Sequence, residues 1–168
     1  AKGLPAGPGG ARGRVVLTAD DAAAWAKKGE KVILVRTETS PEDVHGMHAA
    51  EAILTAKGGM TSHAALVARG WGKCCIVGCS ALNINLKNKS ISVNGKTIKE
   101  GDWMTLNGTK GRVYEGQLNL LPANPDHNKW YKELMTWADQ VRTLKVRTNA
   151  DSPDDAAAAI KFGAEGIG

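Results

Sequence analysis

No stretch of this sequence approaches the roughly 20 consecutive apolar residues that a membrane-spanning helix needs, which argues against an integral membrane protein. The first residues, Ala1–Pro5, contain neither an initiator methionine nor an apolar signal region. The last residues, Glu165–Gly168, stop within a pattern of apolar residues and glycines. We therefore expect a piece of a larger protein. An apolar fraction of 42% and a charged fraction of 23% exclude a disordered tail, a collagen-like fibre and a disulfide-rich miniprotein.

Cysteine is scarce, and its spacing is wrong for a disulfide framework or a zinc site. The three cysteines, Cys74, Cys75 and Cys79, lie within six positions, and their odd number leaves one thiol unpaired. A Cys-x-x-Cys pair and a neighbouring pair of histidines are both missing. We expect reduced thiols that pack in or beside a strand, in an intracellular protein.

The net charge of +5 and the pI near 9.2 suit an anionic partner. The basic residues are spread along the chain, however, and no cluster of them alternates with aromatic residues. A solvated surface accounts for the charge better than nucleic-acid binding does. We expect neither a nucleic-acid partner nor a membrane partner.

The first half of the chain alternates between strand-like and helix-like segments. Runs of strand length occur at 13–17, 31–36, 52–55 and 74–77. Asp20 is the expected N-cap of a first helix that stops at Gly29. Ser40-Pro41-Glu42-Asp43 predicts a second helix start, because serine caps free N–H groups, proline tolerates the first position and acids suit the positive helix end.

After residue 80 the sequence pattern changes to one typical of antiparallel strands. Residues 90–93 and 96–98 alternate polar and apolar residues around Asn94-Gly95, which predicts a hairpin with a primed turn. A second pair of strands is expected at 103–106 and 112–114, with the turn at Asn107-Gly108, so the first domain closes near Leu121. Pro122–Pro125 predicts a boundary, and 126–141 an amphipathic helix. A strand at 144–148 and a capped helix at Ser152-Pro153 then form one βα unit, the expected opening of a second domain.

The segment from Lys57 to Gly70 carries the chemistry. Two glycines make a permissive loop, Thr61 or Ser62 caps a helix that begins near His63, and Gly70 is the expected stop. An imidazole in the first turn of a helix lies where free N–H groups and the helix dipole favour negative charge. That position suits a neutral histidine nucleophile and stabilises a phosphoryl group attached to it. By helix chemistry alone a capping or packing histidine is the simpler interpretation, and no phosphate-loop motif is present.

The residues Gly58-Gly59-Met60-Thr61-Ser62-His63-Ala64-Ala65, followed by Val67-Ala68-Arg69-Gly70 and Gly72-Lys73-Cys74-Cys75, resemble the phosphohistidine signature of the pyruvate, phosphate dikinase family. Phosphoenolpyruvate (PEP) synthase and phosphotransferase-system enzyme I share the wider Gly-Gly-x-Thr-x-His frame. The resemblance continues through Lys2–Ala6, Glu38–Asp43, Asn149–Pro153 and Gly163–Gly168, in the same order along nearly the whole chain.

The resemblance implies an α/β fold: a swivelling, layered β/β/α phosphohistidine domain over 1–121, a linker helix over 122–143 and the truncated start of a PEP/pyruvate-binding (β/α)8 barrel over 144–168. It also implies that a nucleotide-binding domain of the same polypeptide precedes residue 1. The family reaction converts ATP, phosphate and pyruvate to AMP, diphosphate and PEP. His63 matches the histidine that forms the tele-phosphohistidine intermediate and carries pyrophosphoryl and phosphoryl groups between the two sites.

Further implications concern the parent enzyme. We expect Mg²⁺ ligands outside this chain, no metal site within it, and no turnover by the chain alone. A homo-oligomeric parent enzyme is expected, located in the cytoplasm by default, with a plastid or a glycosome as alternatives.

Several other residues are candidates through the resemblance. Thr61 matches a threonine that a regulatory protein phosphorylates in plant members, and capping is its alternative role. Ser62, Thr39, Ser40 and Arg69 are candidate phosphate contacts, although capping explains Ser40 fully. His45 and His48, three residues apart on an expected helix, have a spacing that could bind a metal, but no third ligand is evident, so surface histidines are the simpler interpretation.

Two alternative functions remain open at this point. The chain could be the equivalent domain of PEP synthase, which is separated from the dikinase by the requirement for inorganic phosphate and the release of diphosphate. It could also be a binding module without catalysis, in which His63 is structural and can be replaced without loss of function.

Overall fold

The computed structural model describes residues 1–121 and 128–168, which belong to two compact units, Ala1–Leu121 and Pro122–Gly168. The expected boundary at Pro122–Pro125, together with Asp126 and His127, lies outside the described residues. Each unit is described by itself.

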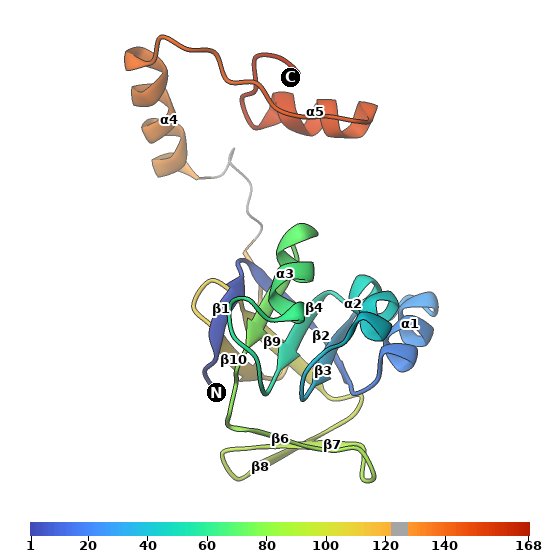
Figure 1. The fold of residues 1–168 in the computed structure, drawn as a ribbon. Coiled ribbons are helices and arrows are strands. Elements are labelled where there is room, and N and C mark those ends of the chain that lie inside the picture. Colours follow the sequence, from blue (N-terminus) through green and yellow to red (C-terminus); the bar gives the residue numbers. More distant parts are fainter. Residues whose placement is uncertain (122–127) are drawn as a thin grey trace. The chain divides into compact units, whose positions relative to one another are not determined.

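Unit 1 is a mixed α/β fold built on a curled sheet (Figure 1). The strands of its large sheet lie in the order β1-β5-β4-β3-β2-β9-β10. Their bounds are β1 (Leu4–Gly7), β2 (Gly10–Val16), β3 (Val32–Arg36), β4 (Ala52–Thr55), β5 (Cys74–Val77), β9 (Trp103–Asn107) and β10 (Arg112–Glu115). The connecting helices are α1 (Ala19–Lys27), the 3-10 helix η1 (Pro41–Asp43), α2 (Val44–Ala49) and α3 (His63–Gly70).

Strands β2, β3, β4 and β5 are mutually parallel, whereas β1, β9 and β10 run antiparallel to their neighbours. The curl brings the first residues toward the opposite edge of the sheet. Lys2 forms an isolated antiparallel bridge with Arg112 of β10, and the amide of Gly3 donates to the carbonyl of Gly111 (2.8 Å). The edges of a seven-stranded sheet are therefore joined at one end.

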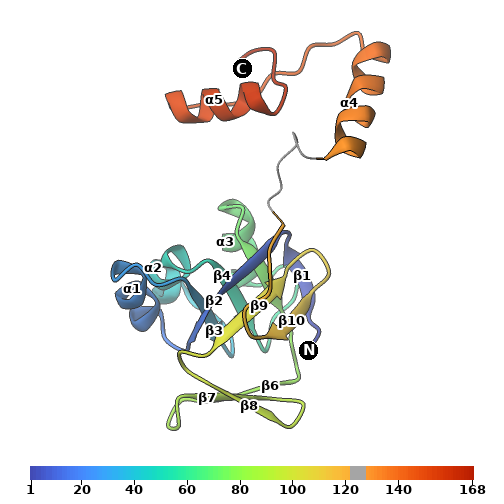
Figure 2. The ribbon, with the colours of Figure 1, turned by 180° about the vertical axis from the view of Figure 1, so that it is seen from behind.

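Two cores lie on the two faces of this sheet. Along β3, Ile33 and Val35 pack with the residues of a second sheet, while Val32 and Leu34 pack with residues of the helices. This alternation follows from the twofold repeat of side chains along a strand. The second sheet is β6-β7-β8, with bounds Leu82–Asn85, Ser90–Val93 and Lys96–Lys99. It covers the face away from α1, α2 and α3, as Figure 2 shows from behind.

Most of the local signals are confirmed by the structure. Ser40 begins η1 with a capping box to Asp43, and Asn94 and Gly95 have the positive φ values of +49° and +80° that a primed hairpin turn requires. Two helix ends differ from expectation. The N-cap of α1 is Thr18, whose hydroxyl accepts from the amide of Asp21 (3.1 Å), so Asp20 lies inside the helix.

The second difference is at the end of α3. Gly70 is its last helical residue, and the left-handed conformation occurs at Gly72 (φ +65°). The carbonyls of Val67 and Arg69 in the last turn accept from the amides of Trp71 and Gly72 (3.2 and 3.1 Å), so Gly70 stays helical and the left-handed residue comes two positions after it.

Unit 2 contains α4 (Lys129–Val141) and α5 (Pro153–Lys161), each capped by its preceding residue, Asn128 and Ser152. The expected strand at 144–148 is not formed as a strand. Only Thr148 is bridged, in parallel, to Ile167, because the described part of this unit offers no longer run of neighbouring backbone for it to pair with. Among the described residues, no helix combines the length and apolar character that crossing a membrane requires.

Candidate functional site

Parallel strands β3, β4 and β5 end at one edge of the sheet, and the segments that follow them meet there. Lys57, after β4, links the three: its amide donates to the carbonyl of Thr37 (2.8 Å), and its carbonyl accepts from the amide of Gly78 (3.4 Å). The hydroxyl of Thr55 donates to the same carbonyl (2.7 Å). Ligands of open α/β sheets bind beyond the carboxyl ends of the strands, so this edge is the candidate site.

His63 is the first residue of α3 and is half-buried at this edge. Its Nδ1 lies 3.0 Å from the hydroxyl oxygen of Thr39, which comes from the segment after β3. Within the described part of the chain, no hydrogen bond is made by the other ring nitrogen, Nε2. The imidazole is thus oriented through Nδ1 and has Nε2 free to react, the arrangement that a histidine nucleophile needs.

The start of α3 is open to an anion. Ser62 is the N-cap residue by position, but its hydroxyl makes no capping bond, so the N-cap side chain leaves the free N–H groups of the first turn unoccupied. The Ser62 Oγ is buried and has no hydrogen-bond partner in the described residues. It packs against Gly58, where an added Cβ would lie 3.0 Å from it.

The guanidinium of Arg69 lies on carbonyl oxygens. Its Nε donates to the carbonyl of Ala65 (3.2 Å), and its Nη2 donates to the carbonyl of Met60. Arg69 therefore ties the last turn of α3 to the loop that precedes His63. In this arrangement it stabilises the loop directly.

Two other candidate residues, Thr61 and Ser40, lie at the surface. Thr61 is exposed. Ser40 is also exposed, and its amide and hydroxyl both point to the carboxylate of Asp43 (3.0 and 3.5 Å). Of the candidates, the structure therefore places only Thr39 in contact with His63.

The three thiols are buried and free in the described structure. Burial raises the pKa of Cys74 to about 11 and that of Cys75 to about 12, and it also raises the pKa of Cys79. The Sγ of Cys75 lies 3.8 Å from the carbonyl of Ala64, so it packs β5 against the first turn of α3. Thiols held in the protonated form are poor nucleophiles, and these cysteines act as packing residues.

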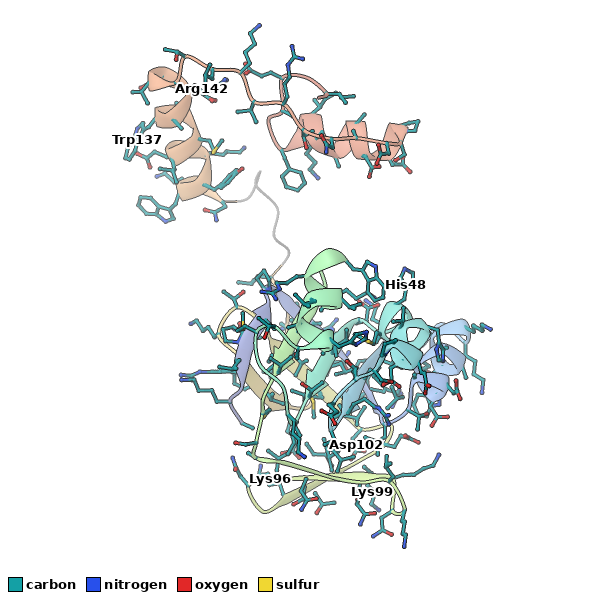
Figure 3. The ribbon with its side chains drawn as sticks, in the orientation of Figure 1. His48, Lys96, Lys99, Asp102, Trp137 and Arg142 are labelled. Carbon is teal, nitrogen blue, oxygen red and sulfur yellow. The ribbon has the colours of Figure 1, made fainter. Side chains whose placement is uncertain are left out.

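His45 and His48 are engaged separately. The ring of His45 bonds the carboxylate of Asp20 (2.8 Å) and the carbonyl of Glu42 (3.0 Å). His48, labelled in Figure 3, makes an edge-to-face contact with Trp71, with ring centroids 5.1 Å apart. In the portion of the chain that the structure describes, no group of three or more His, Cys, Asp or Glu residues is arranged to hold a metal ion.

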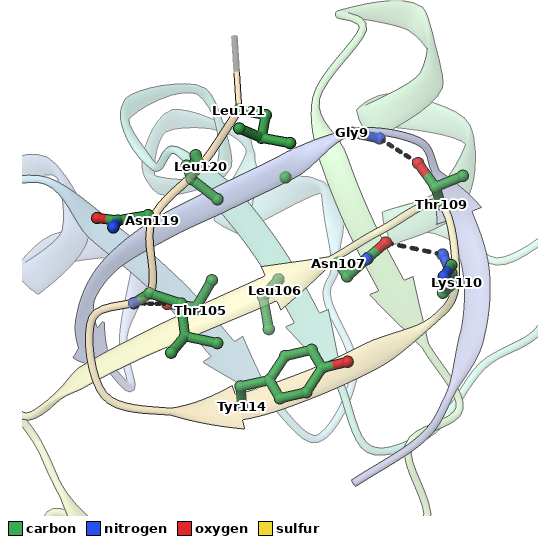
Figure 4. Close-up of a pocket in the computed structure, with 12 residues that line it drawn as sticks. Gly9, Thr105, Leu106, Asn107, Thr109, Lys110, Tyr114, Asn119, Leu120 and Leu121 are labelled. Carbon is green, nitrogen blue, oxygen red and sulfur yellow. Dashed lines mark hydrogen bonds between the residues drawn. The ribbon is translucent and has the colours of Figure 1, made fainter. Parts of the chain in front are cut away.

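A hollow of about 500 Å³ lies elsewhere on unit 1, between β9, β10 and the segment that follows them (Figure 4). Leu106, Tyr114 and Leu120 line it, and His63 does not. The hydroxyl of Thr105 holds the following segment in place by donating to the carbonyl of Gly116 (2.8 Å) and accepting from the amide of Leu118 (3.0 Å). This hollow is therefore formed by the end of unit 1 as it folds back over the sheet.

A free Nε2 at the open start of a helix defines a histidine that can carry an anionic group. A family model described as "PEP-utilising enzyme, mobile domain" matches residues 28–111, half of the chain, and this range includes the whole site. The chain belongs to this family of mobile domains.

The particular relatives are pyruvate, phosphate dikinases. The chain is 58% identical, over its whole length, to pyruvate, phosphate dikinase 1, chloroplastic, of Arabidopsis thaliana. It is 55% identical to pyruvate, phosphate dikinase of Clostridium symbiosum, over 98% of this chain. It covers 17% and 19% of these two relatives, so it spans less than a fifth of their length. An NMR structure of Enzyme I is also similar, with a TM-score of 0.38 and 22% identity over 66% of this chain and 38% of that one.

Sequence reasoning named His63 and Thr39 as candidates, and the structure brings these two together. It did not indicate the residues that hold their two segments side by side. Lys57 acts through its backbone, which carries no side-chain signal. Asp43 was recognised only as an acid at a helix start, and its ion pair with Arg36 (3.6 Å) depends on the loop conformation.

Proposed function

We propose that this chain is the phosphoryl-carrying domain of a pyruvate, phosphate dikinase, with Nε2 of His63 as the nucleophile. The observation that carries the proposal is the 3.0 Å contact between Nδ1 of His63 and the Thr39 hydroxyl. This contact orients the ring, and it leaves Nε2 without a hydrogen bond to any described residue. The identity to dikinases over the whole chain supports the choice of reaction.

The proposed sequence has three transfers. Nε2 attacks the β-phosphorus of ATP, the bond to the α-phosphate oxygen breaks, and AMP leaves while a pyrophosphoryl group remains on His63. An oxygen of inorganic phosphate then attacks the terminal phosphorus and departs with it as diphosphate. Finally the enolate oxygen of pyruvate takes the remaining phosphoryl group, which gives PEP and restores the free imidazole. The tele-phosphohistidine formed at Nε2 retains the Thr39 contact at Nδ1.

The residues around His63 have distinct roles in this proposal. The unpartnered hydroxyl of Ser62 and the open N–H groups of α3 are available to a phosphoryl oxygen. Arg69 holds the loop before His63 and Ser40 begins the next helix, and both are proposed to assist the phosphate when it is bound. Thr61 is exposed and is proposed as a regulatory phosphorylation site, where a phosphate would add about −1.5 to −2 charges two residues from the nucleophile.

The rest of the machinery belongs to the other domains of the parent polypeptide. We assign residues 1–121 to the mobile domain, 122–143 to a linker helix and 144–168 to the start of the PEP/pyruvate barrel. The nucleotide site, the complete pyruvate site and the Mg²⁺ ligands are placed in the remaining domains, where Mg²⁺ would neutralise phosphate charge. A homo-oligomeric enzyme of the cytoplasm, a plastid or a glycosome completes the proposal.

The test is transfer of label to the chain from PEP carrying radioactive phosphorus. The chain would replace the matching segment of the Clostridium symbiosum dikinase, since the two are 55% identical there. We expect an acid-labile, base-stable adduct that His63→Asn abolishes and that His48→Asn, at an exposed histidine on another helix, retains. Equal labelling of the His63→Asn protein would overturn the proposal and leave His63 a structural residue. A full-length parent of this chain that forms PEP from ATP and pyruvate without a requirement for phosphate would assign the chain to a PEP synthase.

A further inference from the structure

Asp43 is a buried carboxylate that the proposed transfers do not use. It lies at the end of η1, only 7% exposed, four residues after Thr39. One carboxylate oxygen accepts from the amide of Ser40 (3.0 Å) and lies 3.5 Å from its hydroxyl. The other oxygen lies 3.6 Å from Nη2 of Arg36. A single side chain thus connects the helix start to the end of β3.

Arg36 completes this connection from the other side. It is the last residue of β3, and its Nη1 donates to the carbonyl of Leu17 (3.3 Å) at the end of β2. Its side chain is 28% exposed, and its Nε is buried without a partner in the described residues. Removing the charge from one member of so enclosed a pair leaves the other uncompensated.

The ion pair closes the two ends of the segment 36–43, and Thr39 lies in the middle. Thr37 is anchored through its carbonyl to the amide of Lys57 (2.8 Å), and Ser40 is anchored through its amide to Asp43. Thr39 therefore lies between two fixed backbone positions. Its hydroxyl reaches the ring of His63 across 24 residues of sequence.

We infer that Asp43 and Arg36 are positioning residues, which act on His63 by holding the Thr39 hydroxyl against Nδ1. The inference rests on the proposed function, since it concerns the nitrogen that is presented for phosphorylation. Reactive groups must be held to within about 0.5 Å of the productive geometry, and an exposed loop has no other buried side chain here to fix it. The ion pair supplies that restraint.

Unit 1 offers a matched control for helix capping. In α1, the carboxylate of Asp21 lies 2.8 Å from the hydroxyl of the N-cap Thr18 and 4.0 Å from Nζ of Lys89. This carboxylate, too, is paired with a capping hydroxyl and a cation, but no hydrogen bond or ion pair among the described residues leads from it to His63. If Asp43 only caps a helix, Asp43→Asn and Asp21→Asn should act alike.

The first measurement is independent of phosphoryl transfer. Imidazole ¹⁵N shifts of His63 would be recorded for the 168-residue chain and for its Thr39→Val, Asp43→Asn and Asp21→Asn variants. We expect Asp43→Asn to move the shifts in the direction of Thr39→Val, and Asp21→Asn to leave them at the wild-type values. Wild-type shifts in Asp43→Asn, together with displaced shifts in Thr39→Val, would overturn the inference.

The second measurement is the rate of labelling in the chimeric dikinase. Asp43→Asn should slow it about ten- to a hundredfold, the loss expected from a displacement of roughly 1 Å. Because Asp43 acts through Thr39, the double variant should be no slower than Thr39→Val alone. A double variant that shows the product of the two single effects would refute the mechanism.

Two further results separate the possible causes of failure. If Asp43→Asn does not fold, Arg36→Lys serves in its place, because lysine keeps the charge but lacks the guanidinium that reaches both Asp43 and Leu17. We expect Arg36→Lys to change the ¹⁵N shifts and the labelling rate in the same direction as Asp43→Asn, but by less. Wild-type shifts and a wild-type rate in Arg36→Lys would overturn the inference. If the wild-type chimera takes no label while the ¹⁵N shifts respond as expected, the proposed function fails and the positioning role stands.

Discussion

Replacement of Gly58 by alanine should destabilise unit 1, whereas replacement of the adjacent Gly59 should not. Gly58 has a φ of +99°, and an added Cβ would lie 2.9 Å from Cβ of Ser62. At Gly59 nothing lies within 4 Å of the added atom, and φ is outside the left-handed range. Alanine at these two consecutive positions is thus predicted to have very different effects on the stability of unit 1.

The magnitude follows from two terms. A left-handed backbone costs an L-residue about 1–2 kcal/mol, and forcing a methyl group into occupied space costs about 1–3 kcal/mol. We expect Gly58→Ala to lower the free energy of unfolding by roughly 2–5 kcal/mol in total. Gly59→Ala should remain within about 0.5 kcal/mol of the wild type. If Ser62 moves to relieve the clash, the cost falls, but His63 is displaced and its labelling slows.

Urea unfolding followed by far-UV circular dichroism would give the free energies of unfolding, and the labelling assay would report on His63. The reasoning is refuted if the two alanine variants have equal stability and equal labelling rates. Greater damage from Gly59→Ala would contradict it more strongly, because the described conformation of the loop would then be wrong.

Two more predictions concern ionisation. Burial raises the pKa of Cys74 to about 11 and that of Cys75 to about 12, and all three thiols are buried. The folded chain at pH 8 should therefore resist alkylation by iodoacetamide, whereas the unfolded chain should take up three equivalents. Rapid alkylation of the folded chain would contradict this prediction. In unit 2, hydrogen bonding to Arg142 lowers the pKa of Glu165 to about 2 from 4.5. Because the pKa of Glu165 is lower in the folded than in the unfolded state, its ionised form stabilises unit 2 fully above about pH 4.5, and this contribution is lost as the pH falls toward 2. A carbon NMR titration of the Glu165 carboxyl group would measure this pKa. A titration midpoint near 4.5 would refute the prediction.

Local signals in the sequence determined most of the secondary structure. The Ser40-Pro41 helix start and the Asn94-Gly95 turn form as expected, because their physical causes involve only neighbours within three or four residues. The same holds for the buried strand that contains Cys75. His63 could also be placed at the start of a helix from the flanking residues alone.

Where two neighbouring residues were equally suited to begin or end a helix, the fold determined which of them does so. Thr18 and Asp20 are both good N-caps, and the end of β2 leaves Thr18 in the capping position. Gly70 and Gly72 can both end a helix, but only Gly72 adopts the left-handed conformation.

The site itself was decided by tertiary structure. The contact between Thr39 and His63 and the ion pair between Arg36 and Asp43 arise because parallel β3 and β4 bring their following loops to one edge. Side-chain type indicates which groups can hydrogen-bond, but strand order and register determine which of them meet. The sequence by itself determined a histidine at a helix start, and only the packing of the strands determined which of its two nitrogens is held and which is free.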